Sequence, residues 1–302
     1  MATIIRAFDG SLDDAEGLLM VEAATFNESP YSPDEVRGML TAGRQRAWLA
    51  LGEGQVVGFV IGFVTHGLRG RCWEIDLLAV LPAWRGHGLA TRLIRAASAH
   101  GARLAPRARA VIADDNSASR HAFERAGFRP APEMCDLQIR RLTGLHLRSP
   151  LTLGVTVHEA TRAAELSHWL PGLQALPQSA ELSVIVAEQH GDLAGYAELI
   201  QVETLLYRGV WIESLVAHSR PARAALVRET TNRALVAGLD EVGAMVPDKD
   251  RAARQALRSA GFRSLGTFQW LVAELPLPGL ASLPGGGLRS VLPGQGGGGL
   301  GV

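Results

Sequence analysis

The first half of the chain alternates between the hydrophobic pattern of strands and that of amphipathic helices. Apolar residues recur at every second position in strands and at spacings of three and four in helices, and flanking Ser, Pro and Gly residues mark the ends. One predicted helix begins at the Ser-Pro-Asp-Glu segment that starts with Ser32. The other predicted helices are 11–26, 86–103 and 116–127, and the predicted strands are 2–8, 46–52, 55–66, 71–81, 107–113 and 134–142. This order predicts a layered α/β fold.

The second half is predicted to repeat this order of elements. Residues 122–129 match residues 256–263 at five of eight positions, and Trp73 has a counterpart in Trp211. A repeat of this length indicates duplication of a whole domain. We therefore expect domains at 1–145 and 152–276, with a seam near 143–152. The Gly- and Pro-rich residues 277–302 are predicted to form a flexible tail.

Charge and composition argue against several functional classes. The 30 basic residues are balanced by 30 acidic residues, so no net field favours nucleic acid or an anionic membrane. Cys72 and Cys135 are too few and too far apart for a disulfide framework or a Cys-x-x-Cys metal site. The N-terminus lacks a signal-peptide pattern, and the longest apolar run, 56–64, is too short to span a bilayer. We expect a cytoplasmic protein without metal, membrane or nucleic-acid partners.

One predicted strand carries two acids where an internal strand should be apolar on both faces. Strict alternation places Glu74 and Asp76 on one face, about 7 Å apart, together with Leu78 and Val80. Leu77 then belongs to the opposite face. The acidic face is predicted to border a cleft. The alternative is an exposed strand face with solvated acids.

A glycine-containing loop follows this strand and opens the next helix. It reads Arg-Gly-His-Gly-Leu-Ala from Arg85 to Ala90. Glycines let backbone N–H groups approach a ligand, and a helix N-terminus adds partial positive charge, which together suit a diphosphate. An ordinary strand-to-helix turn would explain the same residues. The loop is neither a dinucleotide fingerprint nor a Walker loop.

Two segments together resemble the GNAT superfamily of N-acetyltransferases. Residues 77–94, LLAVLPAWRGHGLATRLI, look like the acyl-CoA signature of that family, and residues 116–128, NSASRHAFERAGF, look like its second signature. The resemblance in element order covers 1–142 well and 153–275 weakly. It implies two GNAT-like domains, each with a mixed, mostly antiparallel central sheet flanked by helices, and acetyl-CoA as cosubstrate.

The resemblance also implies contacts with the coenzyme. The backbone of three strand residues would pair with the pantetheine arm and orient the thioester: Leu78, Ala79 and Val80. The loop would cradle the diphosphate through Arg85, Gly86, His87, Gly88, Leu89 and Ala90. Asn116 would contact the coenzyme from the next helix, although a simple helix N-cap explains this residue equally well.

The same resemblance suggests catalytic roles. An amine with a pKa of ~10 must lose a proton before it attacks a thioester. In the family a strand glutamate often takes that proton, and Glu74 has the matching place, with Asp76 as a reserve base or an anchor for a cationic substrate. Many relatives carry a tyrosine as proton donor where this chain has Phe123. Tyr31, between the first two helices, could substitute for it, or it could be an ordinary surface tyrosine.

The second copy has lost the features that suit a coenzyme. Opposite the glycine loop it has the bulkier residues 223–228, and opposite the predicted base it has Ile212. Glu213 is adjacent and could be re-aimed by a one-residue bulge. Asp250 stands opposite Asn116, and its charge would repel a phosphate. The C-terminal domain is therefore predicted to be a degenerate partner that walls the acceptor cleft.

These features together predict an N-acetyltransferase that moves acetyl from acetyl-CoA to a primary amine by direct attack within a ternary complex. The acceptor would be a small-molecule amine or a protein N-terminus, and the chain a monomer or homodimer. The alternative function is an acyl-CoA-binding sensor or scaffold with little turnover, which Phe123 and the degenerate copy favour.

Overall fold

The computed structural model describes residues 2–26, 29–142 and 154–276, so the predicted seam and tail lie outside the described residues. The first half contains the predicted strands and helices in the predicted order. They are β1 (Thr3–Ala7), α1 (Leu12–Thr25), α2 (Pro33–Thr41), β2 (Gln45–Gly52), β3 (Gln55–Gly67), β4 (Gly70–Val80), a 3-10 helix (Pro82–Trp84), α3 (Leu89–Gly101), β5 (Arg107–Ala113), α4 (Ser117–Arg125) and β6 (Arg129–Arg141). The predicted order of elements in this half is confirmed, although β6 begins at Arg129 and not near residue 134.

Local sequence explains where helices of this half begin. Ser32 and Glu35 form a capping box at the start of α2, with proline in the first turn. α3 begins at Leu89, later than the predicted residue 86, because Gly86 and Gly88 have φ values of 81° and 73°. Those left-handed values cannot belong to a right-handed helix.

The second half repeats the order only in part. It contains β7 (Val155–Glu159), a 3-10 helix (Ala163–Leu166), β8 (Leu182–Gln189), β9 (Asp192–Glu203), β10 (Arg208–Ala217), α5 (Arg220–Val236), β11 (Glu241–Pro247), α6 (Arg251–Ser259) and β12 (Arg263–Glu274). Between β7 and β8, the described residues contain no counterparts of α1 and α2, so a complete repeat is the wrong prediction for this segment. Pro171, Gly172 and Pro177 lie there, and they disfavour a regular helix.

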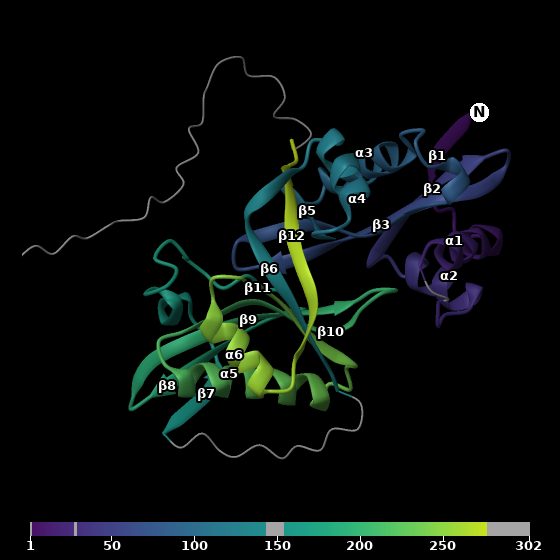
Figure 1. The fold of residues 1–302 in the computed structure, drawn as a ribbon. Helices are drawn as coiled ribbons and strands as arrows, with labels where there is room; N and C mark the ends of the chain where they lie inside the picture. The colour runs from purple at the N-terminus through teal and green to yellow at the C-terminus, as the bar shows by residue number, and fades with distance from the viewer. Residues whose placement is uncertain (1, 27–28, 143–153, 277–302) are drawn as a thin grey trace, which may run out of the picture.

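The twelve strands of the described residues form one sheet, in the order β1-β2-β3-β4-β5-β12-β6-β11-β10-β9-β8-β7. The last strand of each half completes the sheet of the other half: β12 pairs with β5, and β6 pairs with β11. Figure 1 shows β12 running between β5 and β6. Only the β4–β5 and β10–β11 pairs are parallel among the described pairings. The mixed, mostly antiparallel sheet flanked by helices is as predicted, and the exchange joins the two copies into one layer.

Helices cover both faces of the first half's sheet. α3 and α4 pack over a cluster that includes Trp73 and Ile75, and α1 and α2 pack over a cluster that includes Leu77 and Ala79. The second half's Leu205, in the turn between β9 and β10, is buried in the α1–α2 cluster. Among the described residues, no helix has the length and apolar character needed to cross a membrane.

The strand β4 contains a bulge at Asp76. Ile75 pairs with Gly62 and Leu77 pairs with Ile61, so Asp76 is an extra residue on β4. The strict alternation predicted for this strand is therefore wrong beyond Asp76, because a bulge shifts the register by one residue. Leu77 packs in the α1–α2 cluster, on the face opposite Ile75, and not beside Ile75 as alternation requires.

Candidate active site

β4 and β5 run parallel but pair over only a short length. Their ladder joins Trp73 to Ala108 and Glu74 to Arg109. The described ladder stops there, although β4 continues to Val80. Strands that separate leave backbone N–H and C=O groups on their facing edges without a sheet partner. A ligand with amide groups of its own can pair with such an edge.

The predicted pantetheine-binding residues lie on this separated part of β4. Ala79 and Val80 are buried and Leu78 is half-buried, so their side chains pack in the fold. The Nε atom of Arg85 donates a hydrogen bond to the carbonyl oxygen of Val80 at 3.1 Å. This bond ties the glycine loop to the end of the strand, and it brings the two predicted coenzyme segments together.

The glycine loop opens onto the N-terminus of α3. A Cβ atom at Gly86 or Gly88 would meet no atom of the described residues within 4 Å. Gly88 is the N-cap, and no side chain of the described residues caps the helix. The N–H groups of the first turn are therefore available to an anion. His87 is exposed and Ala90 half-buried, whereas the buried Leu89 anchors the helix in the core.

The other predicted residues have structural contacts that the sequence left open. The Oδ1 atom of Asn116 accepts a hydrogen bond from the N–H of Ser119 at 3.0 Å, so Asn116 is the N-cap of α4. Its contact with a coenzyme stays a prediction. Tyr31 is half-buried against the α1–α2 cluster. Phe123 is buried and packs edge-on against Phe128, with ring centroids 5.1 Å apart.

Glu74 is buried in an ion-pair network that spans both halves. Its Oε1 atom accepts from the hydroxyl of Thr65 at 2.5 Å, and Nε of Arg109 lies 2.9 Å from both carboxylate oxygens. The other two nitrogens of Arg109 bind Glu213 of the second half, at 2.6 Å and 2.9 Å. The Arg109 guanidinium also lies over the ring of Trp270, 4.2 Å from its centroid. Glu74 is therefore fully engaged within the protein.

Charge keeps Arg109 and Glu213 of this network ionised. Burial alone would lower the pKa of Arg109, but Glu74 and Glu213 outweigh it and hold that pKa well above its usual value. Burial alone would raise the pKa of Glu213, but Arg109 outweighs it and lowers that pKa. A cation between two carboxylates leaves the network with one net negative charge.

Asp76 differs from Glu74 in having an unpaired oxygen. Its Oδ2 atom is buried and has no hydrogen-bond partner among the described residues. Burial raises the pKa of Asp76 to about 6, the charge of Glu74 adds to this effect, and a hydrogen bond with Thr204 of the second half opposes it. A carboxylate with these properties can take a proton near neutral pH.

Several residues of this region were not identified from the sequence. Arg109 alternates with small apolar residues in β5, a pattern that is typical of an ordinary half-exposed strand. Gln45 bears two buried polar atoms, and Glu22 one, that have no hydrogen-bond partner in the described parts of the chain. Gln45 is aligned across the sheet with Phe63, which is aligned with Glu74. Buried unpaired polar groups of this kind are unusual in native proteins.

The equivalent region of the second half is filled by its own side chains. Ala225 and Leu226, opposite the glycine loop, are completely buried. Arg223 donates a hydrogen bond to the carbonyl oxygen of Ala217 at 2.6 Å, at the end of β10. Asp250 is the N-cap of α6. The Arg223 bond and the Asp250 cap match those of Arg85 and Asn116 in the first half. The halves differ at Ala225 and Leu226, and at Ser219, whose side chain caps α5.

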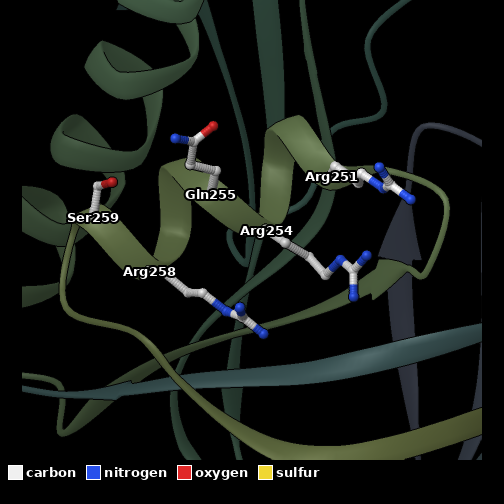
Figure 2. Close-up of a pocket in the computed structure, with 5 residues that line it drawn as sticks. All are labelled: Arg251, Arg254, Gln255, Arg258 and Ser259. Carbon is white, nitrogen blue, oxygen red and sulfur yellow. The ribbon is translucent and has the colours of Figure 1, made fainter.

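A separate pocket of about 280 Å³ lies on α6. Figure 2 shows Arg251, Arg254 and Arg258 projecting from one side of that helix. Arg254 and Arg258 lie 3.9 Å and 3.5 Å from the carboxylates of Asp248 and Asp136, which neutralise part of their charge. The pocket contributes no group to the network around Glu74. No cluster of three His, Cys, Asp or Glu side chains suited to a metal was found in the described ranges.

Comparison with known proteins agrees with this geometry. A model of the acetyltransferase (GNAT) family matches residues 17–128, which include β4, the glycine loop and α4. No significant match was found among curated protein sequences.

Solved structures resemble the chain over both of its halves. A GCN5-related N-acetyltransferase from Sphaerobacter thermophilus has 19% identity and a TM-score of 0.57, over 90% of this chain and 96% of that one. A GCN5-related glucosamine N-acetyltransferase region of a fungal multi-domain GH3 beta-N-acetylglucosaminidase has 17% identity and a TM-score of 0.56, over 90% and 38%. A tandem GNAT protein from the clavulanic acid biosynthesis pathway has 14% identity and a TM-score of 0.50, over 91% and 99%. At these identities the likeness concerns the fold.

Proposed function

We propose that the chain transfers acetyl from acetyl-CoA to a primary amine at a site in its first half, because residues 17–128 match the model of the acetyltransferase (GNAT) family. The observation that carries this proposal is the separation of β4 from β5 directly beyond Glu74, next to the buried unpaired oxygen of Asp76. Acetyl-CoA supplies the activated acetyl group. The residues of the chain bind it, orient it and move one proton.

The first half has the features that an acyl-CoA requires. The separated edge of β4 at Leu78, Ala79 and Val80 offers backbone groups to the pantetheine amides. The open space at Gly86 and Gly88 leads to the uncapped N-terminus of α3, where a diphosphate is stabilised by N–H groups and by the helix dipole. Arg85, His87 and Ala90 line the same loop, and Asn116 is the proposed contact from α4.

Asp76 is the residue that we propose to take the proton from the amine. The amine nitrogen then attacks the thioester carbon, the C–N bond forms, and the C–S bond breaks. Glu74 is engaged by Arg109 and acts in this proposal on the charge around Asp76. A thiolate of pKa near 8.5 is a good leaving group, so it can gain its proton from water, with Tyr31 as the alternative donor.

The acceptor is proposed to enter from the α1–α2 side of the sheet. Asp76 lies against Thr204, and Arg44 forms a 3.5 Å ion pair with Glu203, so the β9–β10 hairpin of the second half borders this side. The neighbouring Gln45 has unpaired polar atoms to offer a polar acceptor. A negatively charged network favours a cationic amine, which includes small amines and protein N-termini.

The experiment that tests this function is an acceptor screen. The full chain is incubated with acetyl-CoA and a panel of small amines, glucosamine and peptides with free N-termini. We expect thiol release that depends on one class of amine, and a mass increase of that amine by one acetyl group. Calorimetric binding of acetyl-CoA without acceptor-dependent thiol release would instead indicate an acyl-CoA sensor. The absence of binding would contradict both functions.

Leu226 provides a test of the division between the halves. Because its side chain is completely buried on α5, Leu226→Ala should lower the free energy of unfolding by about 2–5 kcal/mol. Leu193→Ala, at a position 37% exposed, is the matched control and should have a much smaller effect. Urea unfolding measures both. A folded Leu226→Ala variant that no longer binds acetyl-CoA would place coenzyme in the second half.

A further inference from the structure

We propose that Glu213 and Trp270 of the second half are positioning residues for the active site of the first half. They hold the guanidinium of Arg109 against Glu74 and thereby set the charge beside Asp76. This inference rests on the proposed function, since it assigns the second half a role in that same site. It makes the second half part of the catalytic unit.

The contacts of Arg109 hold its guanidinium in a single orientation. Its Nη1 and Nη2 atoms bind the two oxygens of Glu213 at 2.6 Å and 2.9 Å, and its Nε atom faces Glu74 at 2.9 Å. A forked pairing of this kind is directional as well as strong. Trp270 covers one face of the guanidinium at 4.2 Å. Two of the three side chains that fix Arg109 come from the second half.

Two irregularities of the sheet bring these residues to Arg109. The register of β10 against β9 shifts between Ile212 and Ser214, so Glu213 is an extra residue at a bulge. Such a bulge re-aims a side chain that alternation would send elsewhere. Trp270 lies on the exchanged strand β12, directly opposite Val111 of β5, which places it diagonally across from Arg109.

The arrangement matters for Asp76 because the charge of Glu74 acts on Asp76, and Arg109, which Glu213 and Trp270 hold in place, offsets that charge. With Glu213 present, one cation is shared by two carboxylates. Without Glu213, Arg109 pairs with Glu74 alone, and the net charge near Asp76 changes from negative to neutral. The other charged groups around the network are Glu198 on β9, Arg107 on β5 and Arg69 in the β3–β4 turn.

The test replaces Glu213 with Gln in the full chain. It follows protonation of Asp76 by carbon NMR of carboxyl-labelled protein, with the Asp76 signal assigned through Asp76→Asn. The wild-type midpoint is expected near 6. Removing one negative charge should lower the Asp76 midpoint by roughly half a pH unit. The acidic limb of the pH profile of acetyl transfer should shift by the same amount. Glu213→Asp keeps the charge and should restore the wild-type midpoint.

The control is Glu159→Gln, which removes a carboxylate that pairs with Arg233 at 2.8 Å in the second half. It should leave the Asp76 midpoint unchanged. An unchanged midpoint in Glu213→Gln, with a loss of thermal stability like that of the control, would overturn the proposal. The NMR titration needs no turnover. An inactive wild type that shows the expected midpoint shifts would contradict the proposed function, whereas unchanged midpoints in an active wild type would contradict only the role of Glu213 and Trp270.

A second variant covers the case in which Glu213→Gln does not fold. Trp270→Leu removes the ring that shields Arg109, so water screens the guanidinium and Glu74 is neutralised less. The Asp76 midpoint should then rise, in the direction opposite to Glu213→Gln. Trp270→Phe keeps an aromatic face and should stay near wild type. Equal midpoints in Trp270→Leu and wild type would overturn the proposal.

Discussion

Asp76→Asn is expected to lower acetyl transfer at neutral pH by roughly 10²-fold or more, the usual scale for loss of a general base. The substitution keeps the shape of the side chain and removes its ability to take a proton. Acetyl-CoA affinity should change little, because Asp76 lies on the side of the sheet proposed for the acceptor. Steady-state rates and calorimetry on the same preparation separate these effects. Glu74→Gln should chiefly destabilise the fold, because Arg109 loses a buried partner.

Asp76→Asn should also stabilise the protein at neutral pH. The pKa of Asp76 is raised from its ordinary 3.8 to about 6 in the folded state. The folded state favours protonated Asp76, so this residue contributes its full stabilisation below pH ~4. That contribution is lost as the pH rises through 6. The wild type should lose up to about 3 kcal/mol relative to Asp76→Asn across this window. Urea unfolding at several pH values between 4 and 8 measures the difference.

The control for both effects is Asp192→Asn, at the exposed first residue of β9. It should change neither the rate nor the pH dependence of unfolding. If Asp76→Asn retained full activity while a folded Glu74→Gln variant lost it, the base would be Glu74. If the stability difference between Asp76→Asn and wild type were constant with pH, the shifted titration of Asp76 would be contradicted.

Gly88→Glu is expected to abolish acetyl-CoA binding. The position lies at the N-terminus of α3 in open space. A new carboxylate there would occupy the proposed diphosphate site and repel the diphosphate. The left-handed φ of 73° adds strain of roughly 1 kcal/mol for any residue with a Cβ, so the melting transition should fall only slightly. Wild type should bind one acetyl-CoA per chain by calorimetry.

Two matched variants separate charge from strain. Gly88→Ala brings the strain without the charge and should keep measurable binding. Gly54→Glu brings the same change to another left-handed glycine in open space, in the β2–β3 turn, and should bind like wild type. Full binding in Gly88→Glu, or two coenzymes per wild-type chain, would contradict a single site in the first half.

The order of strands and helices could be predicted because each element carries its own periodicity and end signals. The exchange of β6 and β12 could not, since an apolar strand has the same pattern whichever neighbour it pairs with. The missing counterparts of α1 and α2 were foreseeable from Pro171 and Pro177, which interrupt the segment.

The site was predictable to the extent that it is local. The glycine loop and the two acids lie within one short segment, and the structure places them at the point where β4 leaves β5. The bulge at Asp76 has no local signal and changes which residues share its face. The partners of Arg109 come from segments far apart in sequence, and only the assembled sheet brings Glu213 and Trp270 to it.

The exchange of terminal strands also governs how the chain can fold during synthesis. The edge of β5 is covered by residues 268–274 of β12, the last strand of the described chain to leave the ribosome. At about 5–20 residues per second, the first half waits on the order of ten seconds with that edge unpaired. A nascent chain in this state is exposed to wrong strand pairing and to chaperones. A stop codon placed after the first half would therefore yield a product with an open edge, and not a working single-domain enzyme.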